Sequence, residues 1–497
     1  MKNLKPIHPW RFLDETEREF VQEPKRNVPV ASDVDVVLVG GGTSGLFAAI
    51  ASGRLGAKTV LIDRFGSLGG NLGPGFLVGG GVRVVTGDEP TFPGGLSGIP
   101  KEFSVRLREL RNTPEQNYAD TSSCVSYLAA VMAQEAGVEL VLSAYASDPI
   151  VENGTITGLF VEGKSGRVAF KARAVVDATG DADIAMRAGA PIMNQIPDNR
   201  AGIYFNIGGV DFARYEEFVS AEGDLSEDDK EWTRQNFSAI TSNVWKGKIK
   251  AKPFPDALTP ALRKASESGE FRVVREIEPG LFIISHKVIK YYDGCGVVSG
   301  RAACAEGCVA SYDMGQLSRI EAALRIHAFE TVGFLRKYAP GFENAYIISM
   351  SPFLGNRYGP CIEGEHVLTP EETHSGCEFH DAVLRTMASV NPKSGEGFPG
   401  FDTPYRILLP KMIGGLLVTG TGASYIRKGH YPNYRRRPVM MVLGQAAGTA
   451  AALAVREGAT PKTLDIKILQ QQLVDDGIYL GDEERLKELG VRSKCKT

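Results

Sequence analysis

Apolar residues follow two kinds of pattern where the globular part of the sequence begins. Val34 to Val39 reads VDVVLV, an almost continuous β-branched run that predicts a strand buried on both faces of a parallel sheet. Leu46 to Leu55 is rich in small and apolar residues and predicts a helix, and Lys58 to Ile62 predicts a second short strand. Strand, glycine-rich turn, helix and strand within about 30 residues form a βαβ unit.

The same patterns continue downstream. Helices are expected at Pro100 to Leu110, Cys124 to Ala136, Leu317 to Tyr338 and Gly444 to Val455. Strands of a smaller antiparallel sheet are expected at Val138 to Leu142, Ile150 to Val151, Thr155 to Glu162 and Arg167 to Ala172. A buried strand of the first type is expected at Ala174 to Ala178.

The two ends of the globular sequence resemble each other in composition, and the middle differs. Glycine and alanine are frequent before about residue 200 and after about residue 402, whereas the middle is more polar and contains Trp232 and Trp245. We therefore predict an α/β protein in which a Rossmann-like domain with a parallel sheet is interrupted by an inserted α+β cap domain. The expected boundaries are an arm over 1–30, the first nucleotide-binding part over 31–200, the cap over 201–395, and the second part with C-terminal helices over 396–497.

Charge and composition narrow the class of protein. The 56 Lys and Arg nearly balance the 59 Asp and Glu, giving a net charge of −3, so a broadly basic nucleic-acid binder is excluded. The seven cysteines are sparse and odd in number, which favours a reducing compartment over a disulfide framework. The first thirty residues contain no apolar signal core, and no apolar run reaches the roughly 18 residues of a membrane span. We expect a soluble, cytoplasmic protein with no membrane partner.

The turn between the first strand and helix carries the main chemical signal. In Gly40-x-Gly42-x-x-Gly45, the first glycine permits the tight turn, the second lets the backbone approach a pyrophosphate, and the third allows close helix packing. Asp63 ends the second strand about 20 residues later, where a carboxylate can accept hydrogen bonds from ribose hydroxyls. The sequence therefore predicts a bound dinucleotide.

Glycines elsewhere favour FAD over NAD. The Gly69-Gly70 pair offers bare backbone along an elongated ligand, and Gly444 to Gly448 is expected to begin a second helix near it. A helix start can stabilise the negative charge that develops on a reduced flavin ring. The alternative for these glycines is tight helix packing.

At this point several segments resemble a known family. Asp35 to Asn71 resembles the opening of FAD-dependent oxidoreductases of the glutathione-reductase-like superfamily. Ala174 to Ala185, Leu317 to Thr369 and Tyr405 to Ala454 resemble a poorly characterised FAD-dependent oxidoreductase family within it. The resemblance covers about two-thirds of the chain and indicates no particular substrate.

The resemblance implies FAD contacts in several segments. The glycine turn would hold the pyrophosphate and Asp63 the adenosine ribose, while residues 69–71 run beside the ribityl chain and isoalloxazine. Residues 179–181 would approach the adenine-side phosphates, and Gly420 with the 445–449 helix start would close over the flavin. The implied contacts are Gly40, Gly42, Thr43, Ser44, Gly45, Asp63, Arg64, Gly69, Gly70, Asn71, Thr179, Gly180, Asp181, Gly420, Gln445, Ala446, Ala447, Gly448 and Thr449.

Two segments depart from the family pattern. After the Gly-x-Arg that ends at Arg357, relatives continue with an acidic residue and further arginines, whereas this chain has 358–361 as YGPC. A histidine often found before the last FAD helix is replaced by 428–431, KGHY. No substrate is therefore carried over from the resemblance.

The candidate catalytic residues lie in these departing segments. His430 titrates near neutral pH and is a candidate to abstract a substrate proton. Tyr434 could orient the substrate, and Arg435 to Arg437 could clamp a carboxylate. The resemblance also makes Arg357 a candidate, because Arg357 and Arg435 match arginines of the family's two other signature stretches. The alternative is that the arginines pair with FAD phosphates and that His430 is structural. The histidines show no metal-ligand spacing, so no metal is expected.

The sequence thus predicts an FAD-dependent enzyme with a small-molecule substrate. The favoured reaction is hydride transfer between a small polar or anionic organic molecule and flavin N5, as in a dehydrogenase or oxidase. The alternatives are a flavin-dependent reductase of an activated C=C bond, and a flavin-carrying subunit that needs a redox partner. A homo-oligomer is left open.

Overall fold

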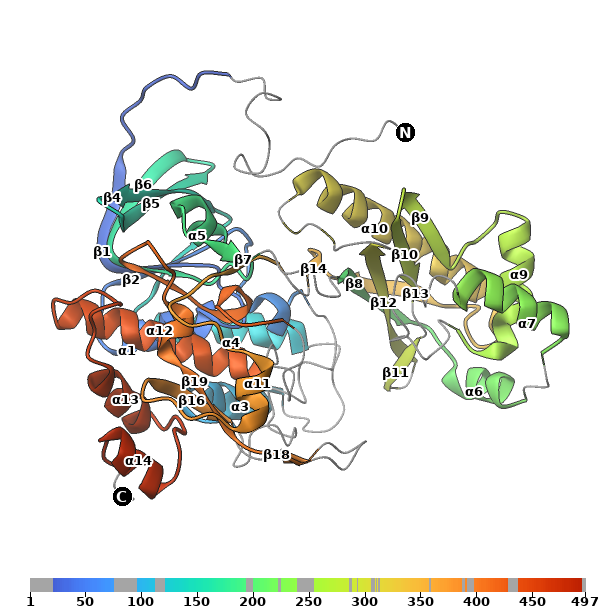
Figure 1. Cartoon of the computed structure of the whole chain (residues 1–497). Coiled ribbons are helices and arrows are strands. Elements are labelled where there is room, and N and C mark those ends of the chain that lie inside the picture. Colours follow the sequence, from blue (N-terminus) through green and yellow to red (C-terminus); the bar gives the residue numbers. More distant parts are fainter. Residues whose placement is uncertain are drawn as a thin grey trace.

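The chain forms two bodies that lie side by side, the first around α1 and α12 and the second around α10 (Figure 1). The computed structural model describes residues 21–75, 96–111, 121–193, 200–221, 225–238, 254–285, 288–292, 294–304, 309, 311, 313–356, 359–386, 389–390, 397–427 and 437–493. The predicted α/β class is confirmed, since a mainly parallel sheet with helices forms the first body.

Seven strands form the sheet of the first body. In chain order these are β1 (Val30–Val39), β2 (Thr59–Asp63), β3 (Glu139–Leu142), β4 (Tyr145–Glu152), β5 (Thr155–Gly163), β6 (Gly166–Asp177) and β20 (Leu416–Val418). The order is β3-β2-β1-β6-β5-β4, with β20 also paired to β6. The pairs β3–β2, β2–β1, β1–β6 and β6–β20 are parallel, so the carboxyl ends of five strands point to one edge.

The smaller antiparallel sheet expected from the sequence is not a separate sheet. β4 and β5 are antiparallel, but they continue the main sheet along the amino-terminal half of β6. The predicted strands 167–172 and 174–178 are one strand, β6, which pairs with β5 through its first half and with β20 through its last residues. β3 pairs with β2 in parallel, so its assignment to the antiparallel sheet was wrong. Local patterning shows that a segment is extended but does not show which strand it pairs with.

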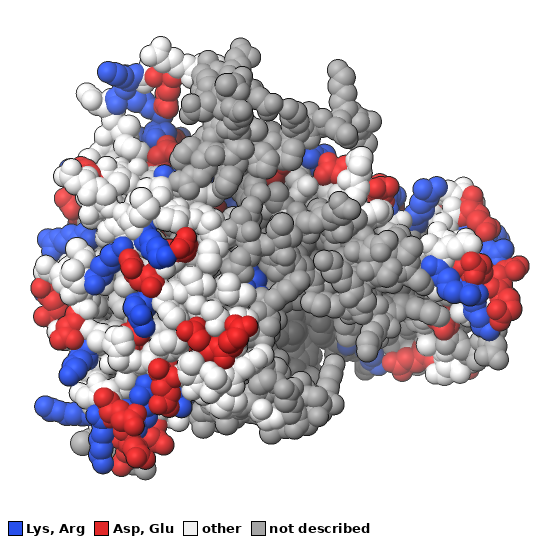
Figure 2. Space-filling model, in the orientation of Figure 1, with Lys and Arg blue, Asp and Glu red and all other residues white. Residues whose placement is uncertain are grey.

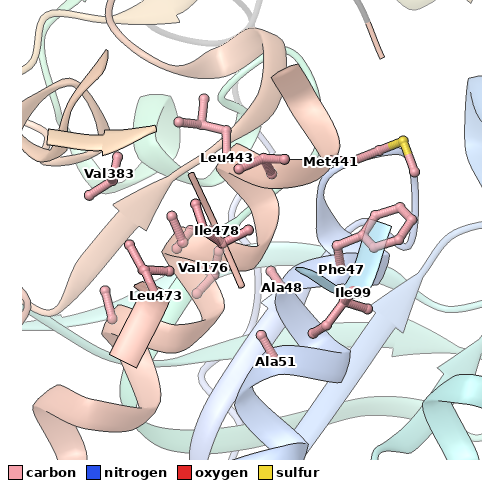
Figure 3. Close-up of a cluster of buried hydrophobic side chains, with 14 of the residues drawn as sticks. Phe47, Ala48, Ala51, Ile99, Val176, Val383, Met441, Leu443, Leu473 and Ile478 are labelled. Carbon is pink, nitrogen blue, oxygen red and sulfur yellow. The ribbon is translucent and has the colours of Figure 1, made fainter. Parts of the chain in front are cut away.

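Both faces of the sheet are covered. Along β1, Val36 and Leu38 join one hydrophobic cluster, whereas Val37 and Val39 join the cluster on the opposite face. This confirms that the run is buried on both sides. The first cluster is built with α1 (Gly45–Arg54), α3 (Gly98–Arg111), α4 (Thr121–Glu135), α12 (Arg437–Arg456) and α13 (Ile466–Asp475) (Figure 3). The second is built with β4, β5 and α5 (Asp183–Ala188).

α12 starts earlier than the sequence suggested. It begins at Arg437, so residues 444–449 lie in the helix interior and the predicted helix start there was wrong. A Cβ atom on Gly444 would lie 2.1 Å from the carbonyl oxygen of Ser44, and one on Gly448 would lie 1.9 Å from that of Ala48. These glycines therefore permit the close crossing of α12 over α1, the packing alternative considered above.

α12 is also long and apolar enough to cross a membrane by length and composition. However, 94% of the relevant window is buried inside the fold. This helix therefore serves as the core helix of the first body, between α1, α13 and the sheet.

A second, mainly antiparallel sheet forms the other body. Its strands in spatial order are β13 (Tyr346–Met350), β8 (Arg200–Gly208), β12 (Cys295–Cys304), β10 (Leu281–Ser285) and β9 (Val274–Glu278), with β11 (Ile289–Tyr292) on β12 and β14 (Gly355–Asn356) on β8. The long helix α10 (Met314–Tyr338) packs across this sheet. Helices α6 (Phe212–Ser220), α7 (Glu227–Thr233) and α9 (Thr259–Glu267) cover its outer end (Figure 1). We call this body the cap.

The chain leaves and rejoins the first body at one place. β7 (Ile192–Met193) pairs antiparallel with β15 (Cys361–Ile362), and the strands of the cap sheet all lie between these two. Leu368, Val383 and Leu384 belong to the core around α1 and α12, so the chain is back in the first body well before the expected boundary at 395.

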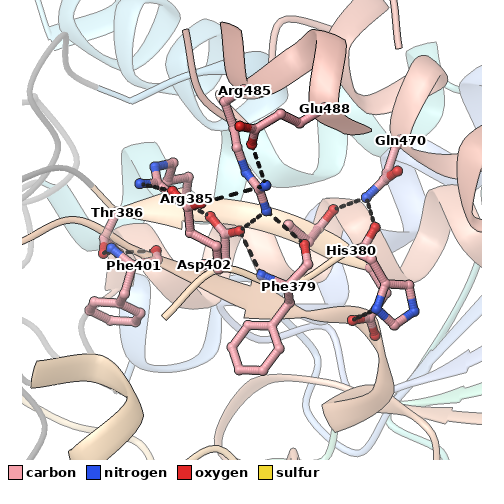
Figure 4. A network of polar contacts seen from close by, with 12 residues as sticks. Phe379, His380, Arg385, Thr386, Phe401, Asp402, Gln470, Arg485 and Glu488 are labelled. Carbon is pink, nitrogen blue, oxygen red and sulfur yellow. Dashed lines mark hydrogen bonds and ion pairs between the residues drawn. The ribbon is translucent and has the colours of Figure 1, made fainter. Parts of the chain in front are cut away.

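The segment after β15 forms the lower edge of the first body. It contains α11 (Pro370–Ser375), the pair β16 (Ala382–Thr386) and β19 (Phe401–Pro404), and the pair β17 (Ser389–Val390) and β18 (Gly397–Phe398). Asp402 of β19 is fully buried and accepts from Arg385 Nη1 at 2.6 Å and from Arg485 Nη2 at 2.7 Å (Figure 4). Arg485 lies on α14 (Glu483–Leu489), so this network ties the last helix to the β16–β19 pair.

Acidic and basic side chains are interspersed on the surface. On the face drawn in Figure 2, described residues of both signs alternate at the outer ends of both bodies. This mixture agrees with the small net charge of the chain.

Candidate functional site

The carboxyl ends of four parallel strands meet at one edge of the first sheet. β1 runs into the glycine turn at Gly40, β2 ends at Asp63, β6 leads into Thr179 to Asp181, and β20 leads into Gly420. In an open α/β sheet, ligands bind in the crevice outside the carboxyl ends of the strands. This edge borders a cavity of about 530 Å³.

The glycine turn has the close approaches that its motif predicts. Gly40 has φ +97°, and a Cβ atom there would lie 2.6 Å from the carbonyl oxygen of Ala178. A Cβ atom on Gly45 would lie 1.8 Å from the carbonyl oxygen of Gly40. Gly42 faces Gly70, whose own Cβ would lie 2.8 Å from the Cα of Gly42. The turn therefore presents bare backbone to the cavity at the start of α1.

Asp63 holds the loops on both sides of it. Its carboxylate accepts from the backbone N–H of Gly41 at 2.5 Å and from that of Phe65 at 2.7 Å. Burial raises the pKa of Asp63, and these two backbone hydrogen bonds oppose that rise. The carboxylate lines the cavity, where its remaining lone pairs can accept from ribose hydroxyls.

Two further carboxylates, Asp181 and Asp183, face the cavity after β6, and Asp177 holds their loop from beneath. The buried carboxylate of Asp177 accepts from Thr179 and from the backbone N–H groups of Ile184 and Ala185, which fixes the loop between them. Burial, followed by repulsion from Asp183, raises the pKa of Asp181 to about 7. Arg64 and Arg427 oppose this rise but do not cancel it. Asp181 therefore changes charge near neutral pH.

Gly420 closes the same edge from the last strand. It has φ +72°, and a Cβ atom there would lie 2.7 Å from Oγ of Ser44. The hydroxyl of Thr421 donates to the carbonyl of Gly180 at 2.7 Å. The loops after β1, β6 and β20 are thus held against one another around the cavity.

Most of the predicted cofactor residues line this cavity. Those that do are Gly40, Gly42, Thr43, Ser44, Asp63, Arg64, Gly70, Asn71, Thr179, Gly180, Asp181 and Gly420. Gly45 and Gly69 support the turn from behind, and the backbone N–H of Gly69 donates to Gly41. Gln445, Ala446, Ala447, Gly448 and Thr449 are fully buried inside α12 and do not line the cavity. The side-chain carbonyl of Gln445 instead accepts from the backbone N–H of Ile99 at 2.9 Å.

The four predicted catalytic residues lie outside the described residues. These are Arg357, His430, Tyr434 and Arg435. Arg437, the last residue of the same arginine run, is described: it begins α12 and lines the cavity.

The cap supplies a wall of the cavity that the sequence did not indicate. Arg301 of β12, Tyr204 of β8 and Asn356 of β14 line it, and the three strands are adjacent in the cap sheet. A Cβ atom on Gly202 would lie 3.3 Å from Cγ of Arg301, so the arginine stem lies across this glycine. The guanidinium of Arg301 makes no hydrogen bond or ion pair with any residue that the structure describes.

An aromatic contact joins the two walls. The rings of Phe65, two residues after Asp63, and Phe353 of the cap are stacked with centroids 4.0 Å apart and planes 14° apart. The hydroxyl of Ser351 donates to the carbonyl of Gly75 at 3.2 Å beside this stack. No motif marks these residues, because only the folded chain brings the cap loop over β2.

The comparison with protein families agrees with this geometry. The model described as FAD dependent oxidoreductase matches residues 35–473, which includes the glycine turn, the cap and α12. The chain belongs to the FAD dependent oxidoreductase family. The predicted cofactor, FAD, and the prediction of an enzyme are thereby confirmed, whereas the finer placement in the glutathione-reductase-like superfamily stays a prediction.

Several proteins of known sequence are similar to part of this FAD-dependent oxidoreductase. The thiamine thiazole synthase of Methanococcus vannielii is 30% identical over 156 residues, which are 30% of this chain and 56% of that protein. The thiamine thiazole synthase of Pyrobaculum aerophilum is 30% identical over 178 residues, which are 34% of this chain and 64% of that protein. The matches therefore cover less than two thirds of the length of these relatives.

Solved structures are more distant. A geranylgeranyl bacteriochlorophyll reductase-like protein from Thermoplasma acidophilum is 14% identical, with a TM-score of 0.39 over 93% of this chain and 89% of that one. A flavoprotein/dehydrogenase from Cytophaga hutchinsonii is 12% identical, with a TM-score of 0.38 over 86% of this chain and 79% of that one.

The residues at the cavity suit FAD. The glycine turn leaves room for a pyrophosphate, and Asp63 stands where the motif places the ribose. In the described part of the chain, the buried Oδ1 of Asn71 and both amide atoms of Asn356 have no hydrogen-bond partner. Buried polar atoms are normally paired, so these amides are available to a ligand in the cavity. Among the same residues, no group of three His, Cys, Asp or Glu could hold a metal ion.

Proposed function

We propose that the chain transfers a hydride between a small polar or anionic organic substrate and N5 of FAD, as a dehydrogenase or oxidase. FAD supplies the redox centre when it is bound. The single observation that carries the proposal is the unpaired guanidinium of Arg301 on the cap wall of the FAD cavity.

An unpaired cation in a partly buried cavity favours an anionic ligand. Withdrawing a charge from water costs free energy unless a partner neutralises it, and Arg301 has no such partner among the described residues. A guanidinium can hold a carboxylate through two parallel hydrogen bonds. Asn356 of β14, across β8 from β12, also lines the cavity and can donate and accept further hydrogen bonds through its unpaired amide.

The pyrophosphate of FAD already has a different binding region. The glycine turn and the start of α1 belong to the first body, whereas Arg301 projects from the cap sheet. We therefore assign Arg301 to binding and orienting the substrate. The assignment of His430 as the proton acceptor stays a prediction from the sequence.

The first experiment tests the reaction. Purified holoprotein is mixed without oxygen with a panel of hydroxy acids, amino acids and their uncharged amides, and the flavin band near about 450 nm is recorded. Loss of the band with a carboxylate-bearing donor is the expected result. If only pre-reduced protein reacts, with an unsaturated acceptor, the C=C reductase replaces the proposal. If no small molecule reacts in either direction and a redox protein copurifies, the flavin-carrying subunit replaces it.

The second experiment tests Arg301. Arg301→Met should raise KM for the active carboxylate by about 10- to 100-fold, the loss of a charge-assisted pair, with unchanged FAD content. The control is Arg214→Met on the outer end of the cap, whose 57%-exposed side chain pairs with Glu343 and should leave KM unchanged. A loss of FAD from Arg301→Met with an unchanged KM would show that the arginine binds the cofactor instead.

A further inference from the structure

The outward face of α10 is apolar and exposed. From the start of α10 to Gly333, every fourth or third residue points to solvent and none of these is charged: Met314, Ser318, Ala322, Ile326, Phe329 and Gly333, which we call the outer stripe. The exposed Arg336 and Lys337 follow it in the last turn. Met314 is 66% exposed, Ile326 57% and Phe329 63%. Figure 1 shows α10 along one edge of the cap, above the strands of the cap sheet. An apolar stripe of this kind on a soluble protein marks an interaction surface.

The sizes of the side chains in the outer stripe identify its partner. A two-fold rotation about an axis perpendicular to α10, near Leu324, generates a second, antiparallel copy of the helix. Each large residue of the outer stripe then lies opposite a small residue of the other copy. Met314 then faces Gly333, Phe329 faces Ser318, and Ile326 faces Ala322. A surface that complements itself under a two-fold rotation is the mark of an isologous contact between two copies of one chain.

The charges beside the outer stripe obey the same symmetry. On one flank, Arg325 of one copy would lie next to Glu321 of the other in the antiparallel arrangement. On the opposite flank, Arg319 would lie next to Glu330. In a parallel arrangement, by contrast, Arg325 would meet Arg325 and Phe329 would meet Phe329, so charge and size both select the antiparallel pair.

These flanking charges are already neutralised within each chain. Arg325 pairs with Glu321 at 2.8 Å, Arg319 with Glu278 at 2.8 Å, and Glu330 with Arg275 at 2.5 Å. These side chains remain about a quarter to a third exposed, so a second copy can extend each pair into a network without burying an unpaired charge.

We infer that α10 pairs antiparallel with α10 of a second copy of this chain, forming a two-fold symmetric dimer through the cap. A helix of 25 residues is about 37 Å long and about 10 Å wide, which gives a contact of roughly 400 Å² on each copy. Stable dimers bury about 800 Å² or more on each partner. The α10 contact has about half that area, so the pair is a weak dimer.

Sedimentation velocity of the full-length holoprotein over a wide concentration range tests the association. The wild-type chain should shift from monomer to dimer as concentration rises through the micromolar range. Ile326→Glu, which places a charge in the stripe, should keep the chain monomeric at every concentration with unchanged FAD content. Met412→Glu, a change at a 75%-exposed residue of the first body, is the matched control and should dimerise like wild type.

Cysteine pairs test the orientation. A mixture of Ser318→Cys chains and Phe329→Cys chains should form a disulfide-linked dimer under mild oxidation, above the background of the native cysteines in the wild-type chain. Either variant alone should cross-link much less. Equal cross-linking of each variant with itself would indicate a parallel pair and overturn the inference.

Two other results would also overturn the inference. One is a wild-type chain that stays monomeric throughout the concentration range. The other is a dimer that Ile326→Glu leaves intact, because its contact must then lie elsewhere. If deletion of residues 1–20 converts a monomeric wild-type chain into a dimer, that segment occupies the stripe instead.

Discussion

Gly448 and Gly333 are both helical glycines, yet their surroundings differ completely. Gly448 of α12 lies against the backbone of α1, where a Cβ atom would be 1.9 Å from the carbonyl oxygen of Ala48. Gly333 of α10 has no heavy atom within 4 Å of its ideal Cβ position. The same substitution therefore has opposite consequences in the two helices.

Gly448→Ala should lower the free energy of unfolding by about 3 kcal/mol, because the two helices must separate to admit the methyl group. Gly333→Ala should raise it by about 0.5 to 1 kcal/mol, because alanine favours the helix and nothing opposes it. Denaturant unfolding of both variants under conditions in which the chain is monomeric measures the difference. Equal effects in the two variants would contradict the close crossing of α12 and α1.

Asp181 should make the stability of the apoprotein depend on pH. Its pKa is about 7 in the folded chain, against 3.8 for an ordinary aspartate, so the folded state holds the proton over a range in which the unfolded state has released it. Stability is therefore highest below about pH 4 for this group and falls as the pH rises to about 7, by on the order of 4 kcal/mol. Asp181→Asn should remove this decline, which thermal unfolding of wild type and variant between pH 4 and pH 8 will show. An unchanged slope in the variant would assign the decline to other groups.

Helices, strands and turns differ in how well their positions and partners could be predicted from the sequence. The strand 34–39 was predicted correctly, and the glycine turn and Asp63 do lie at the cavity, because their positions depend on near neighbours in the chain. The partners of β3 and the single strand β6 depend on pairing across the sheet, which no local pattern records. The predicted helix start at 444 failed because small residues suit close helix packing as well as ligand approach. Arg301, Phe353 and Asn356 were missed because only the position of the cap brings them to the cavity.

The last helix, α14, is expected to depend on one buried carboxylate. Asp402 is fully buried and accepts from both Arg385 and Arg485 (Figure 4). Asp402→Asn should lower the free energy of unfolding by about 1.5 to 3 kcal/mol, because the two guanidinium groups lose their shared buried counter-charge and keep only the more exposed Glu378 and Glu488. Glu457→Gln, which removes an exposed pair with Arg456, should change it by less than about 0.5 kcal/mol. Proteolysis near residue 480 in Asp402→Asn alone would locate the loss in this element.

At the scale of the whole molecule, the cavity exists because two bodies meet. The first body supplies the strand ends and the glycine turn, and the cap supplies Arg301, Tyr204 and Asn356. The stack of Phe65 on Phe353 is a direct contact between the bodies at the cavity. We expect this contact to slow the release of FAD.

Phe353→Ala should raise the rate of FAD dissociation by about 2- to 10-fold, the loss of a stacked aromatic pair. Flavin fluorescence after dilution of the holoprotein measures this rate without reference to any substrate. Tyr346→Ala, at a 56%-exposed aromatic residue of β13, should leave the rate unchanged. Unchanged release from Phe353→Ala would mean that the cap does not help to retain the cofactor.

The pairing of β7 with β15 has a consequence for the origin of substrate preference. Met193 and Cys361 stand directly opposite each other, so the long excursion of the chain between them starts and finishes at one point. A two-residue hairpin joining these positions would close the nucleotide-binding half on itself without disturbing a strand of its sheet. Evolution or protein engineering can therefore insert a different domain at the β7–β15 pair, so that the same FAD-binding domain acts on a different set of substrates.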